Sequence, residues 1–232
     1  MASAGLSRTG LPGILFAVAI ISIIIMGNTL VYLSFRSNPS LFQGLVDNSA
    51  NFPAGIVTAI FAPDAAVLGG SLTFANWSVG FAATLGILFL GFLVASLRAS
   101  SREIGFRSFF YGLMLIVIPI ASNAFSLVRG QTSVGPATVT FASMGLVLGF
   151  SILNAGIWFE RSHPGFQSQS LRDYVSTIVS LAMVFALVYL SVVFPVAFFS
   201  MAPIYSVDWI AYIFCFLIGT VGSFWYFTTR ET

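Results

Sequence analysis

Residues 137–159 read ATVTFASMGLVLGFSILNAGIWF and hold no charged side chain. A helix needs roughly 20 mainly apolar residues to cross the hydrocarbon core of a bilayer, because lipid offers no hydrogen-bond partner to an exposed backbone. Small residues recur at helical spacing here, at Ala142, Gly145, Gly149 and Gly156. Such residues let a neighbouring membrane helix approach closely, so the stretch predicts a spanning helix at the centre of a helical bundle.

The rest of the chain has the same apolar character. Of its 232 residues, 58% are hydrophobic and 7% are charged, which is too little polar surface for a soluble globule of this size. The expected fold is therefore an all-α, polytopic membrane protein with six transmembrane helices, in which residues 1–232 form a single domain. The predicted spans are 12–35, 72–97, 109–128, 137–159, 174–199 and 208–228.

The basic residues are all arginines, and they are unevenly distributed about these spans. Cytoplasmic loops of membrane proteins carry an excess of Lys and Arg. Of the nine arginines, Arg36 and Arg129 fall on one side of the predicted bundle. The others are Arg8, Arg98, Arg102, Arg107, Arg161, Arg172 and Arg230. This distribution predicts an integral, multi-pass protein with both termini in the cytoplasm, and it explains the slight positive charge without a nucleic-acid partner.

The segment between the first two spans, residues 36–70, differs from both. It mixes apolar clusters with prolines and polar residues, and is too broken to span yet too apolar for a free loop. This pattern predicts an interfacial segment that lies partly embedded in the membrane surface. We expect short helical pieces there, interrupted at Pro39, Pro53 and Pro63.

Four asparagines fall within or close to the predicted spans: Asn28, Asn76, Asn123 and Asn154. Amides inside a membrane either bond to neighbouring helices or line the path of a polar substrate. Bonding between helices is the first expectation, and a substrate path is the alternative.

Two short motifs on the fourth and sixth spans resemble the catalytic helices of rhomboid intramembrane proteases. Rhomboids carry Gly-x-Ser-Gly at the top of one helix and Ala-His-x-Gly-x-x-x-x-Gly in the last. This chain has Gly135-Pro136-Ala137 at the first place, and Ala211-Tyr212 followed by Gly219 at the second. In this resemblance, Ala137 stands where the family has its serine and Tyr212 where it has its histidine.

A third motif precedes the second span, where residues 56–68 read IVTAIFAPDAAVL. Thr58 and Phe61 agree with the rhomboid pattern, whereas Pro63 and Leu68 occupy its histidine positions. No asparagine lies near residues 72–73, where the family has an amide that supports the oxyanion. The resemblance thus implies a rhomboid-like six-helix bundle whose catalytic positions are degenerate.

Serine proteolysis needs a nucleophile, a base within reach and donors for the oxyanion. Ala137 has no side-chain oxygen, and the phenol of Tyr212 keeps its proton at neutral pH, which makes it a poor base. His163, the chain's one histidine, falls in a predicted cytoplasmic loop. At 1.5 Å rise per helical residue, this loop is about 25 Å or more from the expected outer-leaflet site at Ala137 and Tyr212. We therefore expect a pseudoprotease that has no catalytic residues and needs no cofactor or metal.

The resemblance implies that the protein binds transmembrane helices of other membrane proteins, or serves as a subunit or scaffold of a larger, hetero-oligomeric membrane complex, in contact with lipid. The candidate client or ligand contacts are Asp208, Tyr212, Thr138 and Phe198. Asp208 has a second interpretation, as an acid that stabilises the N-terminus of the last helix.

Two other classes of function remain open. One is a six-span transporter or channel subunit for neutral or lipid-like cargo, since transport of charged solutes usually leaves ionisable residues inside the spans. The other is an active intramembrane serine protease with a nucleophile in a shifted register, at Ser133 or Ser143. Close packing of Ala137 and Tyr212 would favour the rhomboid-like interpretation over the transporter.

Overall fold

The computed structural model describes residues 10–37, 50, 52–61, 74–96, 101–130, 137–161, 178 and 209–228. Every regular element in this part of the chain is a helix, so the expected all-α fold is confirmed there. The elements are α1 (Leu11–Ser37), α3 (Ala54–Thr58), the 3₁₀-helix η2 (Ala59–Phe61), α4 (Phe74–Ser96), α5 (Ser101–Val128), α6 (Ala137–Arg161) and α8 (Trp209–Thr228). Of the predicted span 174–199, only Ile178 is described.

Four of the five long helices begin and end close to the predicted spans, and α5 is the exception. It begins at Ser101, well before the predicted start at residue 109. Glu103 lies in its first turn, where a carboxylate interacts favourably with the free N–H groups and the helix dipole. Hydropathy identifies only the apolar part of a helix. It therefore does not detect the polar first turns of α5, which lie before the predicted start.

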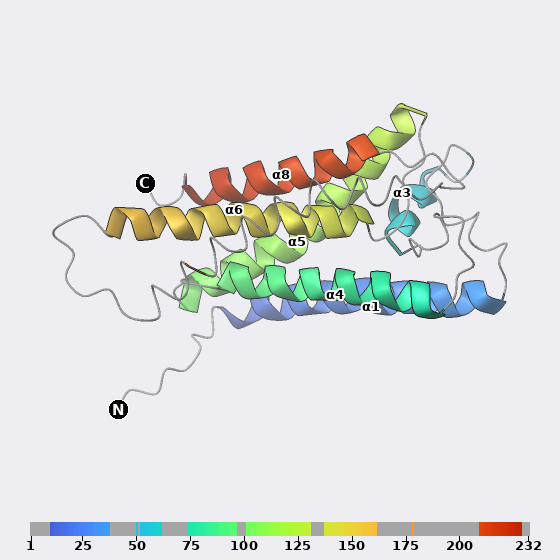
Figure 1. The fold of residues 1–232 in the computed structure, drawn as a ribbon, viewed down its shortest axis with the longest axis horizontal. Coiled ribbons are helices and arrows are strands. Elements are labelled where there is room, and N and C mark those ends of the chain that lie inside the picture. The colour runs from blue at the N-terminus through green and yellow to red at the C-terminus, as the bar shows by residue number, and fades with distance from the viewer. Residues whose placement is uncertain are drawn as a thin grey trace.

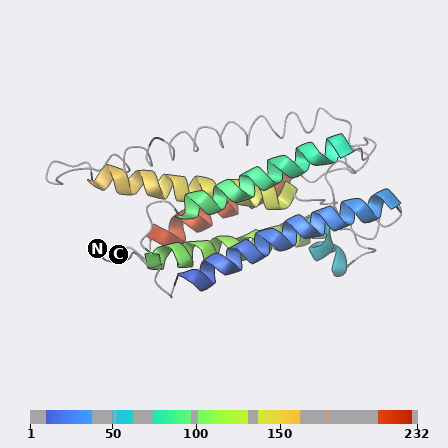
Figure 2. The same cartoon turned by 90° about the horizontal axis from the view of Figure 1, so that it is seen from below.

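Figures 1 and 2 show how the long helices run. Helices α1 and α5 run in one direction, and α4, α6 and α8 run in the other. The short helix α3 lies at the end of the bundle where α1 and α5 finish and the other three begin (Figure 1). We call this the α3 end.

Two helical stretches are long and apolar enough to cross a membrane, namely Leu11–Ser34 in α1 and Glu103–Val128 in α5. The other three long helices hold shorter apolar stretches, at Thr84–Ser96, Thr138–Leu153 and Ile210–Tyr226. These are properties of length and composition among the described residues.

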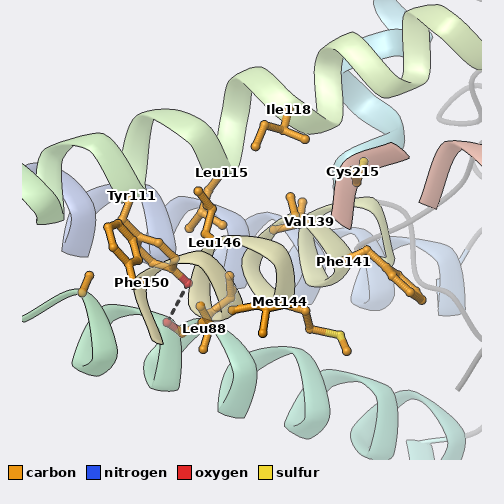
Figure 3. Packing of buried hydrophobic residues seen from close by; sticks show 14 of the residues in the cluster. Leu88, Tyr111, Leu115, Ile118, Val139, Phe141, Met144, Leu146, Phe150 and Cys215 are labelled. Atoms are coloured by element: carbon orange, nitrogen blue, oxygen red, sulfur yellow. Dashed lines mark hydrogen bonds between the residues drawn. The ribbon is translucent and has the colours of Figure 1, made fainter. Parts of the chain in front are cut away.

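Helix α6 lies at the centre of the core. All of its side chains from Thr138 to Ser151 are buried. Figure 3 shows how its apolar residues meet those of the surrounding helices, with Leu88 on α4, Leu115 on α5 and Cys215 on α8. The glycine-rich helix therefore occupies the central position that its composition predicts.

Small residues bring α6 and α8 into close contact. A Cβ atom added to Gly219 would lie 2.8 Å from the carbonyl oxygen of Ala142 and 2.9 Å from the backbone nitrogen of Leu146. One added to Gly145 would collide with the backbone of Phe216. The expectation that the small residues of 137–159 admit a close neighbour is confirmed at Ala142 and Gly145. From Gly145 beside Phe216 to Gly149 beside Ser223, the contacts advance together along both helices, so α6 and α8 are parallel.

The α3–η2 segment begins immediately after Pro53, as expected for one of the short helical pieces in residues 36–70. It buries Gly55, Ala59 and Ile60, while Phe52 and Val57 on its other side are exposed. Pro39 and Pro63, the other two expected interruptions, lie outside the described residues.

Two of the four asparagines hold this segment in place. Asn28 Nδ2 on α1 donates a hydrogen bond to the Phe61 carbonyl oxygen (3.3 Å), and Asn123 Nδ2 on α5 donates one to the Ile56 carbonyl oxygen (2.8 Å). Both amides bond to backbone carbonyls of the short segment, whose few residues leave such carbonyls without intrahelical donors. The side chains of Asn76 and Asn154 lie outside the described part.

Candidate functional site

The first turns of α6 and α8 meet at the α3 end of the bundle. Tyr212, in the first turn of α8, is 3% exposed. Its ring stacks on that of Phe141 from α6, with centroids 5.4 Å apart and planes inclined by 9°. Phe141 lies one helical turn after Ala137. Tyr212, which the resemblance aligns with the histidine of rhomboids, therefore packs against the turn that follows Ala137.

The other predicted site residues are described to different extents. Ala137 is the first residue of α6, and its side chain lies outside the described part. Thr138, the next residue, is 1% exposed. Asp208, Phe198, Pro63 and Leu68 all lie outside the described residues, so the roles expected of them stay predictions.

Ala211, the residue before Tyr212 on α8, is hydrogen-bonded to α5. Ser122 Oγ on α5 donates a hydrogen bond to the Ala211 carbonyl oxygen (2.9 Å). One turn further along α8, Cys215 is fully buried. Ser122 is not predictable as a contact from the sequence, because a single serine in an apolar span carries no signal of its partner.

A second polar group lies deeper in the bundle, between α4, α5 and α6. The hydroxyl oxygens of Tyr111 and Ser143 are 2.6 Å apart, and those of Thr84 and Thr140 are 3.0 Å apart. Tyr111 also donates to the Leu88 carbonyl oxygen at 3.0 Å, the bond drawn in Figure 3. Buried hydroxyls in lipid need such partners, since no water replaces them.

These contacts bear on Ser143 as an alternative nucleophile. Its hydroxyl oxygen lies 2.6 Å from the Tyr111 phenol oxygen and 3.3 Å from the Ile87 carbonyl oxygen. Because the Tyr111 proton is donated to Leu88, the Ser143 hydroxyl donates to the phenol oxygen, and the Ile87 carbonyl is its alternative acceptor. Neither group is a general base that accepts the serine proton at neutral pH. The second alternative, Ser133, lies outside the described residues.

Tyr111 fits into a space left by a glycine. A Cβ atom added to Gly91 on α4 would lie 2.6 Å from Cζ and 2.8 Å from Cε2 of Tyr111. The absence of a side chain at 91 thus allows the phenol to reach the Leu88 carbonyl.

Among the described residues, no three His, Cys, Asp or Glu side chains gather where they could hold a metal ion. The chemical groups at the meeting of α6 and α8 are a phenol, a buried threonine and aromatic rings. Such a set can pack against apolar surface and donate single hydrogen bonds.

Compared with known proteins, the chain matches no protein-family model, no curated protein and no solved structure. In the part of the chain that the structure describes, every regular element is a helix, and two of these helices are long and apolar enough to cross a membrane.

Proposed function

We propose that this chain is a six-span, rhomboid-like membrane protein without proteolytic activity, which binds transmembrane helices of other membrane proteins. The observation that carries the proposal is the Phe141–Tyr212 stack. A tyrosine ring fills the space between α6 and α8 beside the turn where an active rhomboid would hold its serine and histidine.

Three features support multiple membrane crossings. The first is the placement of tryptophan, which is enriched at membrane–water interfaces. All four tryptophans of the chain lie in the first or last turn of a long helix. They are Trp77 on α4, Trp158 on α6, and Trp209 and Trp225 on α8. Because α4, α6 and α8 run the same way (Figure 1), Trp77 and Trp209 in first turns belong to the α3 end, and Trp158 and Trp225 in last turns belong to the opposite end.

The second feature is the position of the arginines within the described helices. Arg36 and Arg129 lie at the α3 end, where α1 and α5 finish. Arg102 and Arg107 near the start of α5, and Arg161 at the end of α6, lie at the opposite end. This separation agrees with a cytoplasmic face opposite the α3 end.

The third feature is the amount of apolar surface that faces outward. Leu15, Ile23, Met26 and Leu30 on α1 are 58%, 55%, 62% and 59% exposed. Helix α8 exposes a further apolar face, made of Ile210, Ile213, Leu217, Val221, Phe224 and Trp225. Contiguous apolar faces of this extent are unusual on a protein surrounded by water and normal on one surrounded by lipid.

The central position of α6 and its parallel contact with α8 support a rhomboid-like arrangement, because the resemblance pairs these two helices. The missing side-chain oxygen at position 137 supports the absence of proteolysis. A protein that keeps this arrangement of α6 and α8 but lacks the catalytic side chains would still be able to bind a transmembrane segment.

The test combines binding and cleavage in one sample. The full chain in bicelles is titrated with a fluorescent transmembrane peptide that active rhomboids cleave, and the products are analysed by mass spectrometry. We expect saturable binding with the peptide intact. A polyleucine peptide of equal length is the control and should bind more weakly. A cleavage product, or equal binding of both peptides, would contradict the proposal.

A further inference from the structure

Two adjacent residues near the end of α5 bond to two different elements. Ser122 Oγ donates to the Ala211 carbonyl oxygen of α8 at 2.9 Å, and Asn123 Nδ2 donates to the Ile56 carbonyl oxygen of α3 at 2.8 Å. Successive residues of a helix point in directions about 100° apart, so one turn of α5 reaches both elements. The same turn therefore holds α3 on one side and the start of α8 on the other.

Further contacts of this part of α5 also go to α8. The Phe125 ring stacks on Phe214 with centroids 5.2 Å apart. The guanidinium carbon of Arg129 lies 5.5 Å from the centroid of the Phe125 ring. By contrast, Tyr111 in the first half of α5 bonds to Leu88 of α4. Of the two parts of α5, the last turns therefore contact the first turns of α8, beside the contacts that α6 makes there.

Pro119 separates these two parts of α5, and it is the proline inside the helix. Proline has no N–H group, so nothing at position 119 donates to the carbonyl of Leu115. Prolines are the usual sites of bending in long helices for this reason. The hydrogen-bond ladder of α5 is therefore interrupted just before the residues that hold α3 and α8.

We propose that residues 120–128 of α5 form one lever, hinged at Pro119, which couples the position of α3 to the first turns of α8. A partner or membrane surface that shifts α3 would then also shift the surroundings of Tyr212. The shift would pass through α5, where Asn123 bonds to α3 and Ser122 bonds to α8. Coupling of this kind is reciprocal, so a change at α8 also moves α3. This coupling rests on the contacts of α5. It does not depend on whether the protein is related to rhomboid proteases.

Cys215 provides a native reporter for the test. It is the chain's one cysteine, and it is fully buried in α8, one turn after Ala211. N-ethylmaleimide therefore labels the full-length protein when this part of α8 opens. Asn123→Ala removes the bond to α3 and leaves the Ser122 bond to α8 in place. In nanodiscs it should raise the labelling rate of Cys215 about 2- to 12-fold, the range expected for one lost hydrogen bond.

Two controls distinguish a lever from general loosening. Tyr111→Phe removes the hydroxyl contacts with Leu88 and Ser143 on the same helix before Pro119, and should change the labelling rate by less than about 2-fold. In a Pro119→Ala background the helical ladder is continuous, so Asn123→Ala should also change the rate by less than about 2-fold.

Asn123→Ser serves as a milder second variant in case the alanine variant does not fold. Unchanged labelling in both Asn123 variants would overturn the proposal. So would an equal increase in Tyr111→Phe, because the effect would then not depend on the part of α5 beyond Pro119.

Discussion

Tyr212 on α8 lies face to face with Phe141 on α6, with ring centroids 5.4 Å apart and an interplanar angle of 9°. The two residues are brought together because α6 and α8 are parallel and meet through small residues. The pair occupies the part of the bundle in which a rhomboid-like alignment places catalysis. The contribution of this aromatic pair to the free energy of unfolding can be measured directly.

Tyr212→Ala should destabilise the protein by about 3–5 kcal/mol, because it removes a buried aromatic ring and leaves a cavity beside Phe141. Tyr212→Phe keeps the ring and should cost no more than about 1.5 kcal/mol. Chemical denaturation in detergent micelles, followed by circular dichroism, measures both values. Equal losses in the two variants would show that the hydroxyl, and not the stacked ring, holds this position.

Gly219 and Gly222 on α8 form a matched pair. Gly219→Ala places a methyl group 2.8 Å from the Ala142 carbonyl oxygen, which is backbone and cannot rotate away. We expect a loss of about 1–3 kcal/mol from this overpacking. Gly222 has open space at the same point, so Gly222→Ala should be neutral or stabilise by up to about 1 kcal/mol through helix propensity. Thermal unfolding of the two variants side by side measures the difference, and a similar response would argue against the close contact of α6 and α8.

Tyr111 and Ser143 should be energetically coupled. A double-mutant cycle of Tyr111→Phe and Ser143→Ala should give a coupling energy of about 0.6 kcal/mol, a typical value for side-chain hydrogen bonds within membranes. Each remaining hydroxyl can still donate to a helix carbonyl, which keeps the single losses small. Unfolding free energies of the three variants and the parent supply the measurement, and strictly additive losses would contradict the 2.6 Å contact.

The proposed topology predicts opposite locations for two fusion points. Green fluorescent protein attached after Thr232 should fluoresce in a bacterial host, because it stays in the cytoplasm. Alkaline phosphatase inserted after Gly130, at the α3 end, should be active, because that end faces the periplasm. An alkaline phosphatase fusion that is active at the C-terminus would contradict the predicted cytoplasmic location of that terminus.

Restoring the two catalytic residues should not restore proteolysis. The variant Ala137→Ser combined with Tyr212→His should give little or no cleavage of a transmembrane substrate, and a serine-directed covalent probe should leave the unmodified chain unlabelled. One oxyanion donor is typically worth about 10²–10³ in rate, and the alignment with rhomboids predicts that Pro63 and Leu68 replace histidines of that family. Strong cleavage by the double variant, measured on gels with purified protein, would show that backbone N–H groups suffice. Cleavage by the unmodified chain would refute its assignment as a pseudoprotease.

Apolar runs and small residues were enough to predict the helical fold, the central position of α6 and its close neighbour. They do not show how far a helix extends into polar sequence, which is why the start of α5 at Ser101 differs from the predicted 109. The resemblance to rhomboids led to the expectation that Tyr212 packs close to Ala137, whose side chain lies outside the described part. The stack on Phe141 depends on ring orientation, which spacing does not define.

The polar contacts were harder to predict. Asn28 and Asn123 stood out as amides within apolar spans, but their partners are carbonyls of the α3–η2 segment. That pairing depends on where a short segment folds back against two helices. Tyr111 and Ser122 carried no signal at all, because a single hydroxyl in a span looks the same whether it bonds to its own helix or to another.

The packing of Tyr111 over Gly91 should constrain which substitutions occur at these two positions in related sequences. With Cζ of Tyr111 2.6 Å from the place a Cβ would take at position 91, a residue larger than glycine at 91 does not fit while position 111 holds an aromatic ring. Among descendants of a common ancestor, a larger residue at 91 should appear together with a smaller one at 111. The two positions, on different helices, should therefore leave a correlated pattern of substitution, while Gly86 and Gly222, which face open space, vary freely.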